Sequence, residues 1–146
     1  MTSFSEKSMP ERIDINDLIP QREPVQMIDT LYEATTEEAH TGLSVSRDNI
    51  FYEGDRLSEM GLIENMAQSA AATAGVKNHL LGIPPSLGYI GEIKKCIFHS
   101  FPTDGEHLHT YVRYVSEAAG VILYDIESRT DRASCAECRM KVFIDE

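Results

Sequence analysis

One long helical segment followed by four closely spaced β-type segments constrains this fold more than any other feature of the chain. Ser58 suits the N-cap of a helix over residues 59–76, which is predicted to end near Gly75 and Val76. β-branched and aromatic residues then dominate residues 88–101, 107–117, 120–128 and 134–144. Connections this short favour antiparallel hairpins over parallel crossovers. The chain is therefore predicted to be α+β, with one long helix packed on a curved antiparallel sheet.

The residues before the helix divide into a lead-in and the start of the domain. Residues 1–12 are polar, without periodicity, and are predicted to be a flexible N-terminal lead-in. Residues 13–146 are predicted to form a single domain. Within it, residues 14–19 favour a short helix stopped by Pro20, and two strands are expected at residues 25–34 and 39–47.

The helical wheel of residues 59–76 predicts which side of the helix packs on the sheet. One broad stripe is apolar: Met60, Ile63, Ala67, Ala70, Ala71 and Ala74. The other side is polar: Asn65, Gln68, Ser69 and Thr73. Because alanine side chains let a sheet backbone approach closely, the apolar stripe is predicted to face the sheet.

Charge and hydropathy exclude several classes of function. Lys and Arg total 13 against 24 Asp and Glu, a net charge of −11, which argues against binding a nucleic-acid backbone. No apolar run has the length of a membrane span, so no membrane partner is expected. Residues 1–20 do not resemble a signal peptide, and a cytoplasmic location is predicted.

The cysteines and histidines are not spaced like metal ligands. Cys96, Cys135 and Cys138 are predicted to be free thiols. Cys135 and Cys138 are three residues apart on a predicted strand, so their side chains should point to opposite faces. No glycine-rich phosphate loop is present either, and we expect neither a metal nor an organic cofactor.

Three motifs carry a resemblance to a known family. They are LIPQREPVQMID at residues 18–29, ENMAQ at residues 64–68, and GYIGEIKKCIF at residues 88–98 followed by PTDGEHL at residues 102–108. In this order they resemble FabZ-type 3-hydroxyacyl-acyl-carrier-protein dehydratases, which have the hotdog fold. The resemblance covers roughly residues 13–144 and implies a long central helix wrapped by a curved antiparallel sheet.

The resemblance implies roles for several residues. In the family a histidine removes the proton next to the thioester carbonyl, and an acid from the opposite subunit protonates the departing hydroxyl. Glu64 occupies the place of the acid, and Gln68, four residues later on the same helix face, could bind or position it. Backbone N–H groups at the helix start, at Gly61 and Leu62, would polarise the substrate carbonyl.

The family histidine is missing from its motif. Residues 51–58 read FYEGDRLS, with Asp55 at the histidine position, and the stretch before Glu64 is shorter than usual. A carboxylate is a weak base for this reaction, and Asp55 followed by Arg56 also suits an ion pair within a loop. The five histidines lie elsewhere: His40, His79, His99, His107 and His109. Of these, His40 is the best placed, because its strand runs toward the Asp55 loop.

Three functions remain open at this point. A chain that keeps the acid and lacks the histidine resembles the dehydratase partner subunits of aryl polyene and flexirubin-type pathways, and would pair with a histidine-bearing paralogue. A hotdog acyl thioesterase would instead use Glu64 or Asp55 to activate water. A subunit that only binds acyl chains or the carrier would be non-catalytic. The chain is expected to form a homodimer or heterodimer, and Lys94 and Lys95 are predicted to contact an acidic acyl carrier protein.

Overall fold

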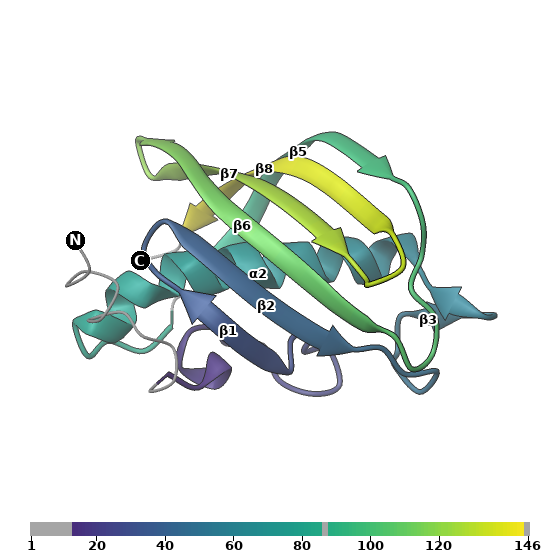
Figure 1. The fold of residues 1–146 in the computed structure, drawn as a ribbon. Helices are drawn as coiled ribbons and strands as arrows, with labels where there is room; N and C mark the ends of the chain where they lie inside the picture. Colours follow the sequence, from purple (N-terminus) through teal and green to yellow (C-terminus); the bar gives the residue numbers. More distant parts are fainter. Residues whose placement is uncertain (1–12, 86–87, 145–146) are drawn as a thin grey trace.

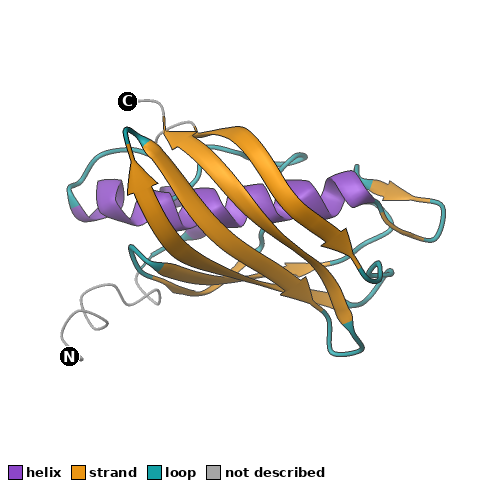
Figure 2. Ribbon diagram, turned by 90° about the horizontal axis from the view of Figure 1, so that it is seen from above, coloured by secondary structure: helices purple, strands orange, loops and turns teal. Residues whose placement is uncertain are grey.

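One antiparallel sheet wraps around a single long helix in the computed structural model, which describes residues 13–85 and 88–144 (Figures 1 and 2). In sequence, the sheet strands are β1 (Thr30–Ala34), β2 (Glu38–Ser44), β5 (Gly88–Phe98), β6 (His107–Ala118), β7 (Val121–Arg129) and β8 (Ser134–Ile144). Their spatial order is β1-β2-β6-β7-β8-β5, and each neighbouring pair is antiparallel. The helix α2 (Glu59–Leu80) lies against one face of the sheet. The predicted α+β class is confirmed, and the predicted lead-in, residues 1–12, lies outside the described residues.

Two smaller elements precede α2. Asp14 caps a 3-10 helix (Ile15–Asp17). The Asp14 carboxylate accepts a hydrogen bond from the N–H of Asn16, and the Asp17 carboxylate accepts one from the N–H of Asp14. β3 (Tyr52–Glu53) and β4 (Arg56–Leu57) form a short hairpin that the sequence pattern did not predict. Figure 2 shows this hairpin beyond the N-terminal end of α2.

The first predicted strand and the predicted helix end were both misplaced. Residues 25–29 are not part of β1, because side chains of α2 take the hydrogen-bonding groups of Val25 and Met27. The helix continues past Gly75 to Leu80. A Cβ at position 75 would collide with the backbone of Leu18, so Gly75 allows close packing rather than ending the helix.

The predicted orientation of α2 was wrong. The polar residues Asn65, Gln68, Ser69 and Thr73 are buried against the rest of the domain. Most of the apolar stripe is only half-buried, and Met60 is 56% exposed. Among the stripe residues, Ala70 alone is fully buried. The inward face of the helix therefore joins these polar residues with the fully buried Leu62, Met66 and Val76, and a half-exposed apolar strip is left toward solvent.

The buried polar side chains of α2 are hydrogen-bonded to the sheet and to the helix backbone. The Thr41 and Ser69 hydroxyls lie 2.8 Å apart, and Ser69 Oγ also donates to the carbonyl of Asn65. Thr110 Oγ1 donates to Asn65 Oδ1 at 2.5 Å. Since burying an unpaired polar group is costly, these bonds are what make an inward polar face possible.

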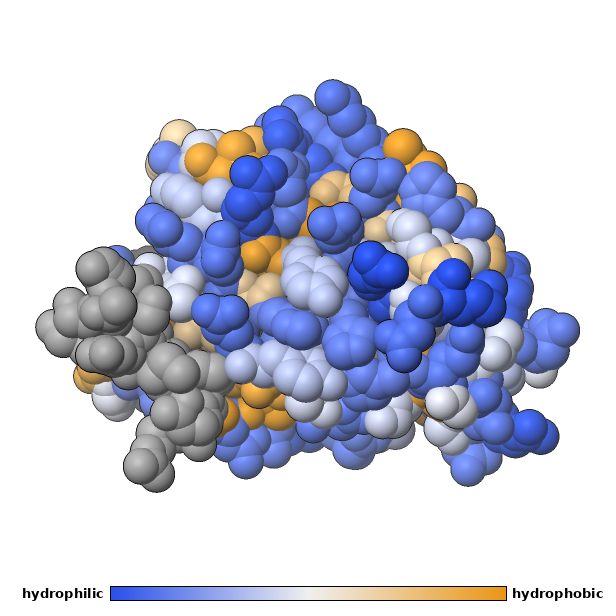
Figure 3. Space-filling view, viewed as in Figure 1, coloured by the Kyte–Doolittle hydropathy of each residue, from blue (hydrophilic) through white to orange (hydrophobic). Residues whose placement is uncertain are grey.

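The opposite face of the sheet carries a cluster of rings, which we call the ring cluster: Tyr32, His40, His107, His109 and Tyr111. Because side chains alternate along a strand and Thr41 and Thr110 face α2, the neighbouring His40, His109 and Tyr111 face away from it. Tyr32 stacks on His40 at a centroid distance of 4.3 Å and on His109 at 5.4 Å, and His40 stacks on Tyr111 at 4.3 Å. The rings of His40 and His109 are tilted, with their centroids 5.2 Å apart. Figure 3 shows that the side of the molecule seen in Figure 1 is mostly hydrophilic, with hydrophobic residues in separate patches.

Two histidines of the ring cluster disfavour their charged forms. His40 Nε2 and His109 Nδ1 lie 2.9 Å apart. The pKa of His40 is lowered by burial and then by the charges of His109 and His107. The pKa of His109 is lowered by burial and then by His107. The unfolded chain therefore binds more protons at these sites than the folded chain as pH falls.

We predict that acid weakens the fold through these histidines. Their folded pKa values lie below the unfolded value of about 6.5, so the free energy of unfolding should fall as pH drops below about 6.5. Urea unfolding should be measured between about pH 7.5 and about pH 5, above the range in which carboxylates titrate. The variant His40→Gln/His109→Gln should flatten this dependence; an unchanged slope would show that other groups cause it.

No helix within the described residues is long and apolar enough to cross a membrane.

Candidate active site

The N-terminus of α2 is closely packed and already hydrogen-bonded. Ser58 is the N-cap, and its Oγ accepts from the N–H of Gly61 at 3.3 Å. The N–H of Leu62 donates to the carbonyl of Ser58 at 3.1 Å. Gly61 has no room for a Cβ, which would meet Leu57 and Phe51. The Leu62 side chain is fully buried, so these two residues offer only backbone groups to a ligand.

Glu64 is held by a buried amide one turn further along the helix. Its side chain is half-buried, and its Oε2 accepts a 2.9 Å hydrogen bond from Gln68 Nε2. Gln68 itself is 1% exposed. The expected contact between these residues, four positions apart on one helix face, is thus present in the structure.

Gln68 is in turn locked to the chain that precedes β1. Gln68 Nε2 also donates to the carbonyl of Val25 at 2.8 Å, and Gln68 Oε1 accepts from the N–H of Met27 at 2.7 Å. Asn65 Nδ2 donates to the carbonyl of Met27 at 2.8 Å. With its oxygen and nitrogen both engaged, the Gln68 side chain has one orientation, and the position of Glu64 Oε2 follows from it.

Asp55 lies at the tip of the β3–β4 hairpin and is exposed. Its carbonyl accepts from the Tyr52 hydroxyl at 2.8 Å. The expected ion pair with Arg56 is not formed: Arg56 lies 3.7 Å from Glu59 and places its guanidinium 3.7 Å from the centre of the Phe101 ring. Within the described residues, no hydrogen bond or ion pair joins Asp55 to another side chain of the site.

The structure places the histidines away from Glu64. His40, His107 and His109 belong to the ring cluster, on the face of the sheet turned away from α2. His99 Nε2 lies 2.9 Å from Glu137 Oε2, and His79 lies near the end of α2. Across residues 13–85 and 88–144, no hydrogen bond connects a histidine with Glu64. One chain thus presents a positioned carboxyl group without a neighbouring imidazole.

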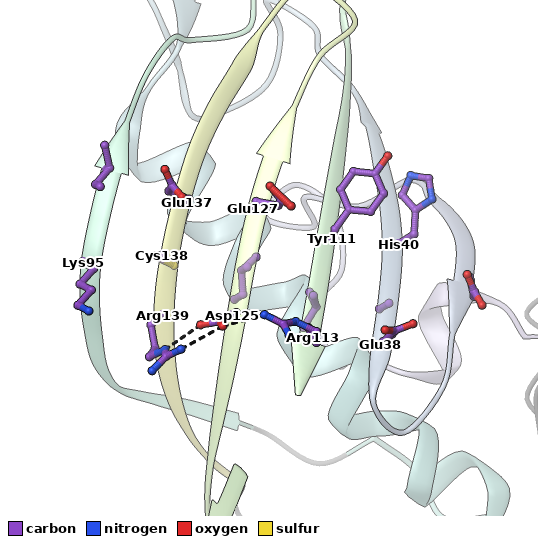
Figure 4. A pocket seen from close by; sticks show the side chains of 15 residues that line it. Glu38, His40, Lys95, Tyr111, Arg113, Asp125, Glu127, Glu137, Cys138 and Arg139 are labelled. Atoms are coloured by element: carbon purple, nitrogen blue, oxygen red, sulfur yellow. Dashed lines mark hydrogen bonds and ion pairs between the residues drawn. The ribbon is translucent and has the colours of Figure 1, made fainter. Parts of the chain in front are cut away.

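Lys94 and Lys95 lie on the edge strand β5, at a bulge where Lys95 has a positive φ of 52°. Lys95 lines a groove of about 610 Å³ on the outer face of the sheet (Figure 4). Within the groove, Asp125 forms ion pairs with Arg113 at 3.2 Å and with Arg139 at 2.7 Å. The hydrogen bond from Arg139 is the main cause that lowers the pKa of Asp125. Among the described residues that line this groove, neither Lys94 nor Glu64 is found.

A second groove lies beside the half-exposed face of α2. Its volume is about 440 Å³, and its apolar lining residues are Ala71, Ala74, Gly75, Leu81, Ile83, Gly120 and Ile122.

In the described part of the chain, no three His, Cys, Asp or Glu side chains are arranged to hold a metal ion.

The arrangement defines the class of the protein: a hotdog fold with a positioned carboxyl group on its central helix. The structure superposes on the dehydratase heterocomplex ApeI:P from Xenorhabdus doucetiae with a TM-score of 0.77, at 16% identity over 92% of each chain. It also resembles the PaaI protein of E. coli, with a TM-score of 0.65, 14% identity, and coverage of 78% of this chain and 81% of that one. These two likenesses show the fold.

Sequence comparison shows the family. The model of the ApeP-like dehydratases matches residues 13–146, and the chain belongs to this family. It is also 26% identical, over 143 residues, to the 3-hydroxyacyl-acyl-carrier-protein dehydratase FabZ of Rhizobium johnstonii, covering 94% of this chain and 90% of that protein. The chain is therefore a dehydratase-family hotdog protein.

We predict that Gln68 stabilises the fold and Glu64 does not. Gln68→Leu leaves the N–H of Met27 and the carbonyl of Val25 without partners, and should lower the free energy of unfolding by about 2–4 kcal/mol. Glu64→Gln should leave stability within about 0.5 kcal/mol of the parent, because the residue is only half-buried. Denaturant unfolding of both variants checks this; equal losses would contradict it.

Proposed function

We propose that this chain contributes the acid, Glu64, to a dehydratase site that a histidine of a partner hotdog subunit completes. The observation that carries the proposal is the separation within one chain. The carboxyl group of Glu64 is held by Gln68 on α2, while His40, His107 and His109 lie across the sheet. Family membership supports the dehydratase reaction, and the similar complex from Xenorhabdus doucetiae is a dehydratase heterocomplex.

The chemistry assigned to the site is loss of water from a 3-hydroxyacyl thioester carried on acyl carrier protein. The partner's imidazole removes the proton next to the thioester carbonyl, and those electrons form the carbon–carbon double bond. The bond to the 3-hydroxyl breaks, and Glu64 gives that oxygen its proton, so water leaves. Because Glu64 Oε2 accepts from Gln68, Oε1 is the oxygen available to carry the proton.

The helix start has a role in this proposal as well. The contact of the Gly61 N–H with Ser58 Oγ is long, at 3.3 Å, so a substrate carbonyl can compete for this donor. The positive end of the helix dipole favours the negative charge that develops on that oxygen. Leu62 lies beside this donor, with its own N–H held by Ser58.

The outward face of α2 supports a partner subunit. Met60, Ile63, Ala67 and Ala71 are exposed or half-buried beside Glu64. The two alanines allow a second chain to approach the helix backbone, and contact with Met60 and Ile63 would remove apolar surface from water. A partner on this face would cover Glu64 at the same time, which excludes bulk water from the reaction.

We predict dehydration only when a partner is present. A 3-hydroxyacyl carrier substrate should lose water when this chain is mixed with a histidine-bearing hotdog paralogue, as followed by mass or enoyl absorbance. Glu64→Gln should lower turnover by about 10²- to 10⁴-fold, as removal of a general acid does. Glu59→Gln, an exposed carboxylate on the same helix, is the matched control and should retain activity.

Other outcomes of this measurement identify the alternative functions. Turnover by this chain alone would mean that Asp55 or one of its own histidines is the base. Release of free thiol, without loss of water, would identify a thioesterase that uses Glu64 or Asp55 to activate water. Full activity of the Glu64→Gln mixture would leave this chain a binding subunit.

We also propose that Lys94 and Lys95 contact the acyl carrier protein. The chain has a net charge of −11, so an acidic carrier needs a local basic surface. Arg113 and Arg139 lie nearby but are paired with Asp125. The two lysines lie at the bulge of the edge strand, where a carrier can approach.

We predict that Lys94→Glu/Lys95→Glu weakens carrier binding by about tenfold or more at low salt, and less at high salt. Lys77→Glu changes charge on the exposed end of α2 and serves as the control. Isothermal titration of the complex with carrier protein measures both. Equal affinities of the double variant and the control would exclude the lysines from the docking surface.

A further inference from the structure

Cys96 and Cys138 lie opposite one another on the two strands at the edge of the sheet. The register of β5 with β8 shifts between Lys94 and Ile97, so that Lys95 and Cys96 together face Cys138. This two-against-one arrangement is a β-bulge, and it turns the Cys96 side chain toward the core.

The two thiols interact with each other and not with the third cysteine. Cys96 and Cys138 lie close enough for each thiol to be among the influences on the pKa of the other. Cys138 is buried, with its Sγ 3.9 Å from Met66 Sδ on α2, whereas Cys96 is half-buried. Cys135 is separate: its Sγ lies 3.8 Å from Ser100 Oγ.

Facing positions on antiparallel strands come close to the spacing that a disulfide requires. Side chains directly opposite in an antiparallel pair have Cβ atoms about 4.5–5.5 Å apart, and a disulfide requires about 3.5–4.5 Å. Closing a disulfide from such a spacing takes a movement on the order of 1 Å. Within one chain, β5 is paired only with β8 and is bulged at this point, so a shift of this size disturbs no other strand of that chain.

We propose that Cys96 and Cys138 are an oxidation site that closes to a disulfide with peroxide. The Cys96 thiolate attacks one oxygen of hydrogen peroxide; a sulfur–oxygen bond forms, the oxygen–oxygen bond breaks, and the second oxygen leaves as water after taking a proton. The Cys138 thiolate then attacks the Cys96 sulfur, and the sulfur–oxygen bond breaks to release a second water. Two thiols are oxidised by two electrons, and one peroxide is reduced to two waters.

The acidity of the thiols sets the expected rate. Burial raises the pKa of Cys96 and raises that of Cys138 to about 12. Since the thiolate is the nucleophile, closure should be slow at neutral pH and should accelerate as pH rises. Cys96 is the less buried of the two and is the residue that peroxide reaches first.

The test uses the full chain, treated with hydrogen peroxide at several pH values and quenched by alkylation. We expect the protein to lose two hydrogens and to retain one alkylatable thiol of its three, with peptide mapping linking Cys96 to Cys138. Reductant should restore all three thiols. The thermal midpoint should rise on closure, because the cross-link restricts the unfolded chain.

Variants separate the steps. Cys135→Ala is the matched control and should still close. In Cys138→Ala, Cys96 should accumulate as a sulfenic acid that dimedone traps; if this variant does not fold, Cys96→Ala should leave Cys138 unreacted. The proposal is wrong if all three thiols survive conditions that oxidise glutathione in the same tube. It is also wrong if the bond involves Cys135 or joins two chains, or if Cys96 passes to sulfinic acid with Cys138 still free.

Discussion

Hydrogen bonds between α2 and its surroundings fix the central helix, and the site depends on them. Asn65 joins Thr110 of the sheet to the backbone of Met27, while Ser69 meets Thr41. Apolar contacts alone would tolerate a rotated or shifted helix. These hydrogen bonds are directional and can all form in only one rotation and position of α2. Gln68 belongs to the same set of contacts, so the carboxyl group of Glu64 takes its position from the core.

The strands could be predicted from the sequence better than the orientation of the helix. Hairpin spacing and β-branched residues are local features, and β6, β7 and β8 lie close to their predicted ranges. The helical wheel gave the wrong orientation of α2 because it assumes that the apolar side of a helix faces the core of its own domain. It cannot distinguish an apolar face that packs on the sheet from one that stays half-exposed. It also cannot foresee that Thr41 and Thr110 supply hydrogen-bond partners for buried polar groups of the helix.

Of the contacts in the candidate site, only the one between two residues of the helix could be predicted from the sequence. Glu64 and Gln68 are four residues apart, and that spacing is enough to place them together. The bonds of Gln68 to Val25 and Met27 span more than 40 positions and leave no trace in local patterns. Arg56 was assigned to its neighbour Asp55, but the Phe101 ring and Glu59 offer it better contacts once the chain folds. The β3–β4 hairpin was also missed, since two-residue strands have no periodicity.

The segment before β1 has no strand and little regular structure, yet it covers part of the hydrophobic core. Ile15, Leu18, Ile19 and Ile28 are buried there, and the backbone of Leu18 lies against Gly75 of the helix. A fragment that began at the first strand would keep every strand of the sheet but would lose these buried residues, which cover one side of the core. The boundary of the folding unit therefore lies well upstream of its sheet, and protease protection of this segment should persist for as long as the helix stays docked.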